Sequence, residues 1–140
     1  MRRPEQQKAS SPRAWVSKAR EDLAAAETLL REGPRHAAAV GFHAQQAVEK
    51  MLKAVLVARG VAFPKTHDLA HLLDLLATVE PLLAGSLGEV EKLTSFAAAL
   101  RYPGIAARGP RVRPETALKL AQRCGERVLA VLCRKPAKKR

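Results

Sequence analysis

The chain has 140 residues, 47% of them hydrophobic, and its 25 Lys and Arg against 13 Asp and Glu give a net charge of +12. This length predicts one domain that buries enough surface to need no disulfides, and the hydrophobic content excludes overall disorder. No stretch approaches the roughly 20 uncharged apolar residues of a membrane span, and the opening MRRPEQQKASSP has no apolar signal segment. We therefore expect a cytoplasmic protein.

The first two predicted helices are separated by a glycine and a proline. Ser11 is an N-cap residue, and Pro12 follows it at the first helical position. The Gly-Pro pair at 33–34 ends this helix, and a second helix is predicted over about 35–59, ending at Gly60. Apolar residues at spacings of three and four form the buried stripe of the first helix: Trp15, Ala19, Leu23, Ala26 and Leu30.

The second helix carries a contiguous polar side. At about 100° per residue, FHAQQAVEKMLKA (42–54) and Val55 place Ala44, Val48, Met51 and Val55 on a core side. The polar side holds His43, Gln46, Glu49, Lys50 and Lys53, while Gln45 lies at the apolar edge beside Leu52 and Leu56. One interpretation is a solvated face with an i,i+4 pair between Glu49 and Lys53, worth about 0.2–0.5 kcal/mol. The other is a surface that binds a partner.

Three further helices are predicted in the second half of the chain. Thr66 is expected to cap the third helix, with Asp68 near the positive end of its dipole and Pro81 at its end. SLGE (86–89) is a capping-box pattern for the fourth helix, and the fifth is predicted over about 114–134. Their expected buried residues are Leu69, Leu72, Leu73, Leu76 and Val79; Val90, Leu93, Ala97 and Leu100; and Ala117, Ala121, Cys124, Val128 and Val131.

Five amphipathic helices with no convincing strand predict an all-α fold, an antiparallel up-and-down bundle of four to five helices. We expect a disordered basic segment over 1–10, one helical domain over 11–134 and a basic tail over 135–140. Cys124 and Cys133 are nine residues apart on one helix and point to opposite sides. A disulfide between them is therefore not expected.

The positive charge is partly terminal and partly internal. RKPAKKR (134–140) has five basic residues and no acidic one, and RYPGIAARGPRVR (101–113) carries four arginines. A basic surface favours an anionic partner such as RNA, a nucleotide or an acidic protein. The simpler interpretation is charge that keeps the protein soluble.

Metal and cofactor chemistry find no support in the sequence. A di-iron bundle requires Glu-x-x-His units, and Asp68-x-x-His71 is a single look-alike. There is no glycine-rich phosphate loop and no Cys-x-x-Cys, and the five aromatic residues are too scattered for a base-stacking platform. We expect neither a metal nor a cofactor.

FHAQQAVEKMLKAVLVARG, FPKTHDLAHLL and ALRYPG, in this order, resemble the HEPN family (higher eukaryotes and prokaryotes nucleotide-binding). WVSKAREDLAAAETLL is similar to the opening helix of that family, so the resemblance covers nearly the whole folded part. It implies an up-and-down helical bundle that commonly forms homodimers. Prokaryotic members of the family are often encoded beside a minimal nucleotidyltransferase and work with it as toxin–antitoxin pairs.

Many HEPN proteins are metal-independent ribonucleases, and others bind RNA or nucleotides without catalysis. The ribonucleases carry an arginine followed by a histidine after four to six residues. Arginine can hold the phosphate, and histidine can move the proton. Arg101 takes the place of that arginine by resemblance, but AAR (106–108) stands where the histidine would be. Arg31 and His36 have the required spacing, but the Gly-Pro break lies between them, which indicates a chance match.

Three functional hypotheses follow. The favoured one is a dimeric nucleotide- or RNA-binding module, able to pair with a minimal nucleotidyltransferase, with contacts from Lys50, Lys53, Lys65, His67, Arg101 and Tyr102. The second is a metal-independent ribonuclease toxin that combines Arg101 with His67 or His43. The third is a scaffold in which the second helix forms the homodimer interface through His43, Gln45, Gln46 and Glu49.

Overall fold

The protein is a bundle of helices in the computed structural model, which describes residues 10–99 and 112–134. Within these ranges every regular element is an α-helix or a short 3₁₀ helix (η), which confirms the all-α expectation. The elements are α2 (Pro12–Glu32), η1 (Pro34–His36), α3 (Ala37–Ala58), α4 (Leu69–Ala77), α5 (Pro81–Ser86), η2 (Gly88–Leu93), α6 (Thr94–Ala99) and α7 (Pro114–Cys133).

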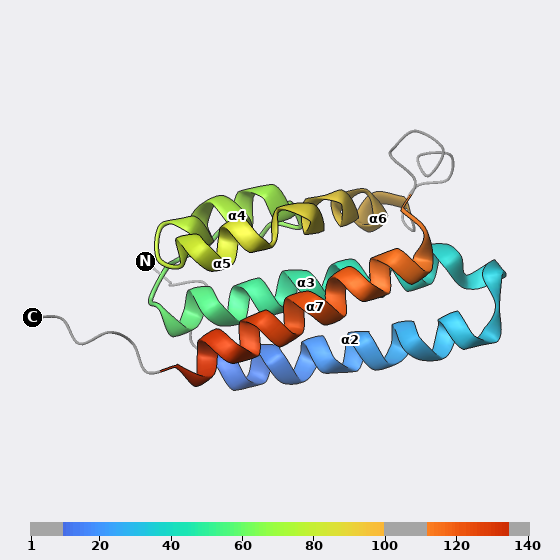
Figure 1. Ribbon diagram of the computed structural model, residues 1–140, viewed down its shortest axis with the longest axis horizontal. Coiled ribbons are helices and arrows are strands. Elements are labelled where there is room, and N and C mark those ends of the chain that lie inside the picture. Colours follow the sequence, from blue (N-terminus) through green and yellow to red (C-terminus); the bar gives the residue numbers. More distant parts are fainter. Residues whose placement is uncertain (1–9, 100–111, 135–140) are drawn as a thin grey trace, which may run out of the picture.

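The long helices α2, α3 and α7 lie side by side (Figure 1). On one side of them, α5, η2 and α6 follow one another along the bundle as a fourth, broken rod, and α4 packs beside α5 and η2. The long helices α2 and α3, joined by η1, run in opposite directions. None of the described helices is long and apolar enough to cross a membrane.

The ends of the long helices follow the predicted signals. Ser11 Oγ accepts a hydrogen bond from the Ala14 amide at 3.0 Å, and Pro12 occupies the first turn of α2. Gly33 ends α2 with φ of 129°, a conformation that residues with a side chain rarely adopt. Pro114 starts α7, as predicted.

The shorter elements differ from the prediction. Asp68, not Thr66, is the N-cap of α4: its Oδ1 accepts from the Ala70 amide at 3.0 Å, while Thr66 Oγ1 accepts from the Asp68 amide. Pro81 does not end a helix but begins α5. Ser86 ends α5, and its hydroxyl donates to the Leu83 carbonyl, so no capping box forms there and the chain continues as η2.

The central helix is α3, which packs against α2, α7, α4, α6 and η2. Because neighbours surround it, its buried residues extend far beyond the predicted core side. Three of them are polar: Gln45, Glu49 and Lys53. The full set of buried residues is Val40, Gly41, Ala44, Gln45, Ala47, Val48, Glu49, Met51, Leu52, Lys53, Ala54, Val55 and Leu56. The α3–α7 contact is close at Gly125, where a Cβ atom would lie 3.3 Å from Met51 Cε.

Most of the predicted core residues of the other helices are buried: Ala19, Ala26, Leu69, Leu72, Leu73, Leu76, Val90, Leu93, Ala117, Ala121, Cys124 and Val128. Half-buried are Trp15, Leu23, Leu30, Val79 and Val131. The side chains of Ala97 and Leu100 lie outside the described part of the chain.

Cys124 is buried, and this burial raises the pKa of its thiol to about 12. Cys133 is exposed, and both cysteines are free.

We predict that Gly41→Ala destabilises the fold. Gly41 lies in α3 directly beneath the Phe96 ring of α6, and an added Cβ would overlap ring atoms. Overpacking of this kind costs roughly 1–3 kcal/mol and should lower the Tm by about 3–10 °C, measured by circular dichroism. The matched control is Gly85→Ala in α5, where a Cβ meets no atom within 4 Å. A Tm as high for Gly41→Ala as for Gly85→Ala would contradict this packing.

Candidate functional site

A buried polar cluster lies at the centre of the molecule. Gln45, Glu49 and Lys53 are spaced one helical turn apart on α3, with exposed fractions of 0%, 4% and 6%. The Glu49 carboxylate accepts from Lys53 Nζ at 3.0 Å and from Gln45 Nε2 at 3.3 Å. A buried carboxylate is tolerated only with such partners, since removing a charge from water costs several kcal/mol.

The third partner of Glu49 is His67, which comes from the connector between α3 and α4. His67 Nδ1 lies 2.7 Å from Glu49 Oε1, and Gln45 Nε2 donates to the His67 carbonyl at 3.2 Å. Gln46 Nε2 in turn donates to Gln45 Oε1 at 2.7 Å, so both ends of the Gln45 amide are satisfied. These bonds fix the His67 ring, whose side chain is 42% exposed, with Nδ1 inward. Among the described residues, Nε2 of this ring forms no hydrogen bond within the chain.

Aromatic rings cover the Lys53 ammonium. Its Nζ lies 5.5 Å from the Trp15 ring centroid and 5.6 Å from that of Phe63, within the range of cation–π attraction. The two rings meet edge to face with centroids 6.3 Å apart. Lys53 therefore joins α2 and the connector to α3 instead of facing solvent.

A second carboxylate, Asp22 of α2, compensates the rest of the polar side. His43 Nδ1 lies 2.9 Å from Asp22 Oδ1, and Lys50 Nζ lies 2.5 Å from Asp22 Oδ2. The side chains of His43 and Lys50 are 30% and 23% exposed. The expectation of a solvated polar face is thus wrong for Glu49 and Lys53, because α2 and the connector cover them.

The predicted site residues therefore fall into separate groups. The structure brings Lys53 and His67 together around Glu49, whereas Lys50 lies apart on Asp22. Lys65 is exposed in the connector two residues before His67. Arg101 and Tyr102 lie outside the described residues. Of the predicted interface residues, Gln45 and Glu49 are buried within the chain, whereas His43 and Gln46 are half-buried.

The sequence did not predict three residues of these clusters as site residues: Asp22, Trp15 and Phe63. Asp22 had a usable signal, since at about 100° per residue it lies only about 20° from Trp15, beside the buried stripe of α2. An acidic residue there predicts a buried partner. Phe63 had no such signal, because a connector has no periodicity.

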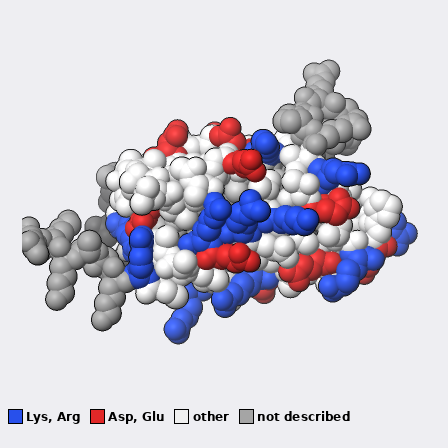
Figure 2. Space-filling view, viewed as in Figure 1, with Lys and Arg blue, Asp and Glu red and all other residues white. Residues whose placement is uncertain are grey.

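The internal pairs shape the outer surface. Asp22 and Glu49 each compensate two basic groups, and Glu80 lies 2.9 Å from both Arg59 Nε and Arg134 Nη2. These pairs withdraw Lys50, Lys53 and Arg59 from the exterior together with the acids. Outside them, Lys and Arg gather in a band over α7 on the face that Figure 2 shows.

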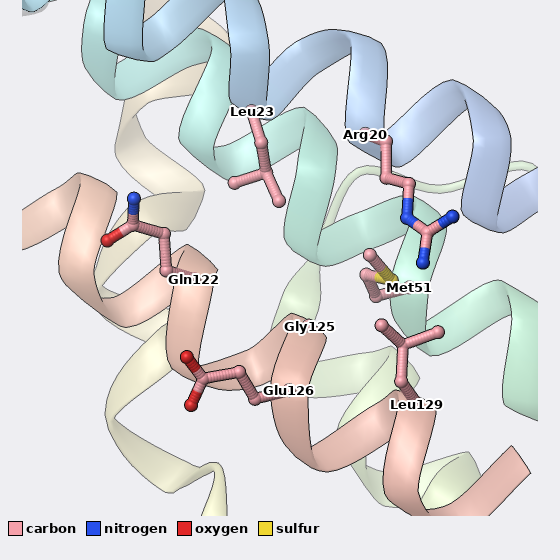
Figure 3. Close-up of a pocket in the computed structure, with 7 residues that line it drawn as sticks. All are labelled: Arg20, Leu23, Met51, Gln122, Gly125, Glu126 and Leu129. Atoms are coloured by element: carbon pink, nitrogen blue, oxygen red, sulfur yellow. The ribbon is translucent and has the colours of Figure 1, made fainter. Parts of the chain in front are cut away.

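A groove with a volume of about 370 Å³ lies between α2 and α7 (Figure 3). Leu23, Met51, Gly125 and Leu129 form its apolar part, and its polar lining residues are Arg20, Gln122 and Glu126. It contains no histidine and no group of metal ligands, and no cluster of three His, Cys, Asp or Glu that could hold a metal occurs among the described residues.

Comparison with known proteins agrees with this architecture. A family model described as HEPN domain matches residues 12–135, and the chain therefore belongs to the HEPN family. The crystal structure of TT1696 from Thermus thermophilus is similar, with 30% identity and a TM-score of 0.65 over 85% of this chain and 96% of that one. The comparison with curated proteins finds no match.

We predict that Glu49→Gln is strongly destabilising, because it leaves the Lys53 ammonium buried without its carboxylate. Breaking a buried pair costs about 3–5 kcal/mol, measurable by urea denaturation. Glu126→Gln, at an exposed position of α7, is the matched control. The double variant Glu49→Leu/Lys53→Met should recover much of the loss, because it removes both charges. A single variant as stable as the control would show that the pair contributes nothing.

Proposed function

We propose that this HEPN protein is a nucleotide- or RNA-binding module whose phosphate contacts centre on His67. The observation that carries the proposal is the 2.7 Å pair between His67 Nδ1 and buried Glu49. This pair orients a half-exposed imidazole with its Nε2 edge outward. A protonated ring donates Nε2–H to a phosphate oxygen, and such charge-assisted hydrogen bonds are among the stronger ones.

Neighbouring cations extend this contact. Lys65 is exposed two residues away in the same connector and supplies a point charge. Arg101 and Tyr102 remain in the proposal on the family resemblance, as a bidentate phosphate fork and a hydroxyl or stacking group. Lys50 and Lys53 are left out, because Asp22 and Glu49 already hold their ammonium groups.

The same geometry favours a second candidate, a metal-independent ribonuclease. A carboxylate that holds one ring nitrogen of a histidine leaves the other free to move a proton, as in carboxylate–histidine pairs of hydrolases. Glu49 would orient His67 as the proton-transfer group, and Arg101 would bind the phosphate. His43 is held similarly by Asp22, at 2.9 Å, and is the alternative proton carrier.

We predict that His67→Asn weakens binding of RNA or nucleotide by roughly tenfold, the loss of one charge-assisted hydrogen bond. Asn keeps an amide donor within reach of Glu49 but lacks Nε2, so the fold should be retained. His71→Asn is the control, since His71 is exposed on α4. Fluorescence anisotropy with labelled RNA and titration with ATP measure the affinities. Equal affinities for the two variants would refute the His67 site.

Cleavage is followed in the same samples with EDTA present. Cleavage of RNA by the native protein that is lost in His67→Asn but kept in His71→Asn would favour the ribonuclease over the binding module. Loss in a His43→Asn variant instead would assign the proton transfer to His43.

We further propose that the protein acts as a homodimer and pairs with a minimal nucleotidyltransferase, as the family resemblance implies. The seam must then use residues other than Gln45 and Glu49, which are buried within the chain. We expect light scattering to give twice the mass of one chain and a co-expressed minimal nucleotidyltransferase to co-elute. A monomer that elutes alone would contradict both proposals. A homodimer that binds neither RNA nor nucleotide would leave the scaffold hypothesis.

A further inference from the structure

A row of cations runs along the outer face of α7. Lys119, Arg123 and Arg127 are spaced four residues apart, so that they are separated by about 6 Å along the helix axis. Lys119 and Arg123 are exposed and Arg127 is half-buried, with its Nη1 donating to the Ser86 carbonyl at 2.6 Å. We refer to these three residues as the α7 ridge.

The α7 ridge forms no close ion pair with the described residues. Among residues 10–99 and 112–134, no carboxylate lies within 4.0 Å of Lys119, Arg123 or Arg127. Two acids of α7 flank the ridge. Glu115 lies one turn before Lys119, and Glu126 lines the groove toward α2 and is turned by about 100° from Arg127. Figure 2 shows a continuous basic band over α7 that is bordered by acidic groups.

At one end the α7 ridge meets a groove between α5 and α7. The groove has a volume of about 340 Å³, and Arg127 and Arg134 line it together with Leu82, which is 88% exposed. The other lining residues include Pro81 and Val131, so most of its wall is apolar. It combines an apolar surface with two guanidinium groups and the Glu80 carboxylate, which lies 2.9 Å from Arg134 Nη2.

The α7 ridge lies on the opposite side of α3 from His67. Met51, which contacts α7 at Gly125, and Glu49, which holds His67, are two residues apart on α3. Two residues correspond to about 200° around a helix. The ridge is therefore a surface separate from the His67 site.

We propose that the α7 ridge binds the phosphodiester backbone of single-stranded RNA and that the α5–α7 groove receives an unpaired base. A convex helix cannot enclose a free nucleotide, but a linear row of cations follows a linear polyanion. An unpaired base can stack on an arginine guanidinium or lie on an apolar wall, whereas the bases of a duplex are covered by one another.

An acidic protein is the other polyanion to consider. Protein interfaces are enriched in aromatic residues at their centre, and neither α5 nor α7 contains one. The absence of an aromatic anchor argues against a protein interface but also removes aromatic stacking from RNA binding, so the regular spacing of the ridge is what favours RNA. The proposal rests on the RNA binding proposed above and adds a second contact surface to it.

The test compares two double variants of the full chain. Lys119→Gln/Arg123→Gln removes two ridge charges and avoids Arg127, whose bond to Ser86 supports the fold. Arg13→Gln/Arg31→Gln removes two exposed charges from α2 and is the matched control. Affinity for labelled oligouridylate is measured over a range of salt concentrations, with duplex RNA and poly-L-glutamate as competitors.

A plot of log affinity against log salt falls as salt rises. We expect the ridge variant to make this fall less steep by about 1.4, since each phosphate contact on a single strand contributes about 0.7. At about 0.1 M salt this corresponds to roughly 20-fold weaker binding, because counterion release contributes little near 1 M. The control should stay within about twofold of the native protein. Oligouridylate should also bind more tightly than duplex RNA or poly-L-glutamate.

The outcomes separate the two proposals. If the native protein binds RNA and both double variants bind equally, the ridge proposal is overturned and RNA binding stands. If the ridge variant loses affinity but His67→Asn does not, the ridge stands and the His67 site fails. If poly-L-glutamate competes as well as oligouridylate, the surface serves an acidic protein and the RNA assignment is overturned. If the native protein binds no RNA, both fail.

Discussion

The structure depends on one buried carboxylate. Glu49 is 4% exposed and lies in the middle of α3, where desolvation of its charge would cost several kcal/mol without partners. Its partners come from two places: Gln45 and Lys53 from its own helix, and His67 from the connector. This requirement holds the connector against α3, and Trp15 extends the arrangement to α2 through the Lys53 ammonium.

Two other acids form internal pairs like that of Glu49. Asp22, Glu49 and Glu80 each hold two basic groups inside the bundle or between its helices. These pairs take up 3 of the 13 acids and 4 of the 25 Lys and Arg, so the remaining charges are still predominantly basic. The basic excess is therefore a property of the composition, and the proposals of an anionic ligand build on it.

How far local signals predicted the fold depended on the length of each element. The ends of α2 and α7 followed Ser11, Pro12, Gly33 and Pro114, because caps and prolines act within one turn. Between residues 78 and 94 the signals were ambiguous. A proline both follows helices and begins them, and Pro81 does the latter. The short helices there are held by packing of Leu83, Leu87, Val90 and Leu93, which a local pattern does not order into α and 3₁₀ segments.

The sequence by itself determined the long helices, the family and the basic character, because periodicity, motif order and charge are properties of the chain. Only the tertiary structure decided which residues on the polar side of α3 are buried. A helical projection assumes one buried face, whereas α3 is surrounded, so that FHAQQAVEKMLKA has polar residues buried among its neighbours. Whether Glu49 and Lys53 meet water depends on Trp15, Phe63 and His67, which are distant in sequence and become neighbours only when the bundle packs.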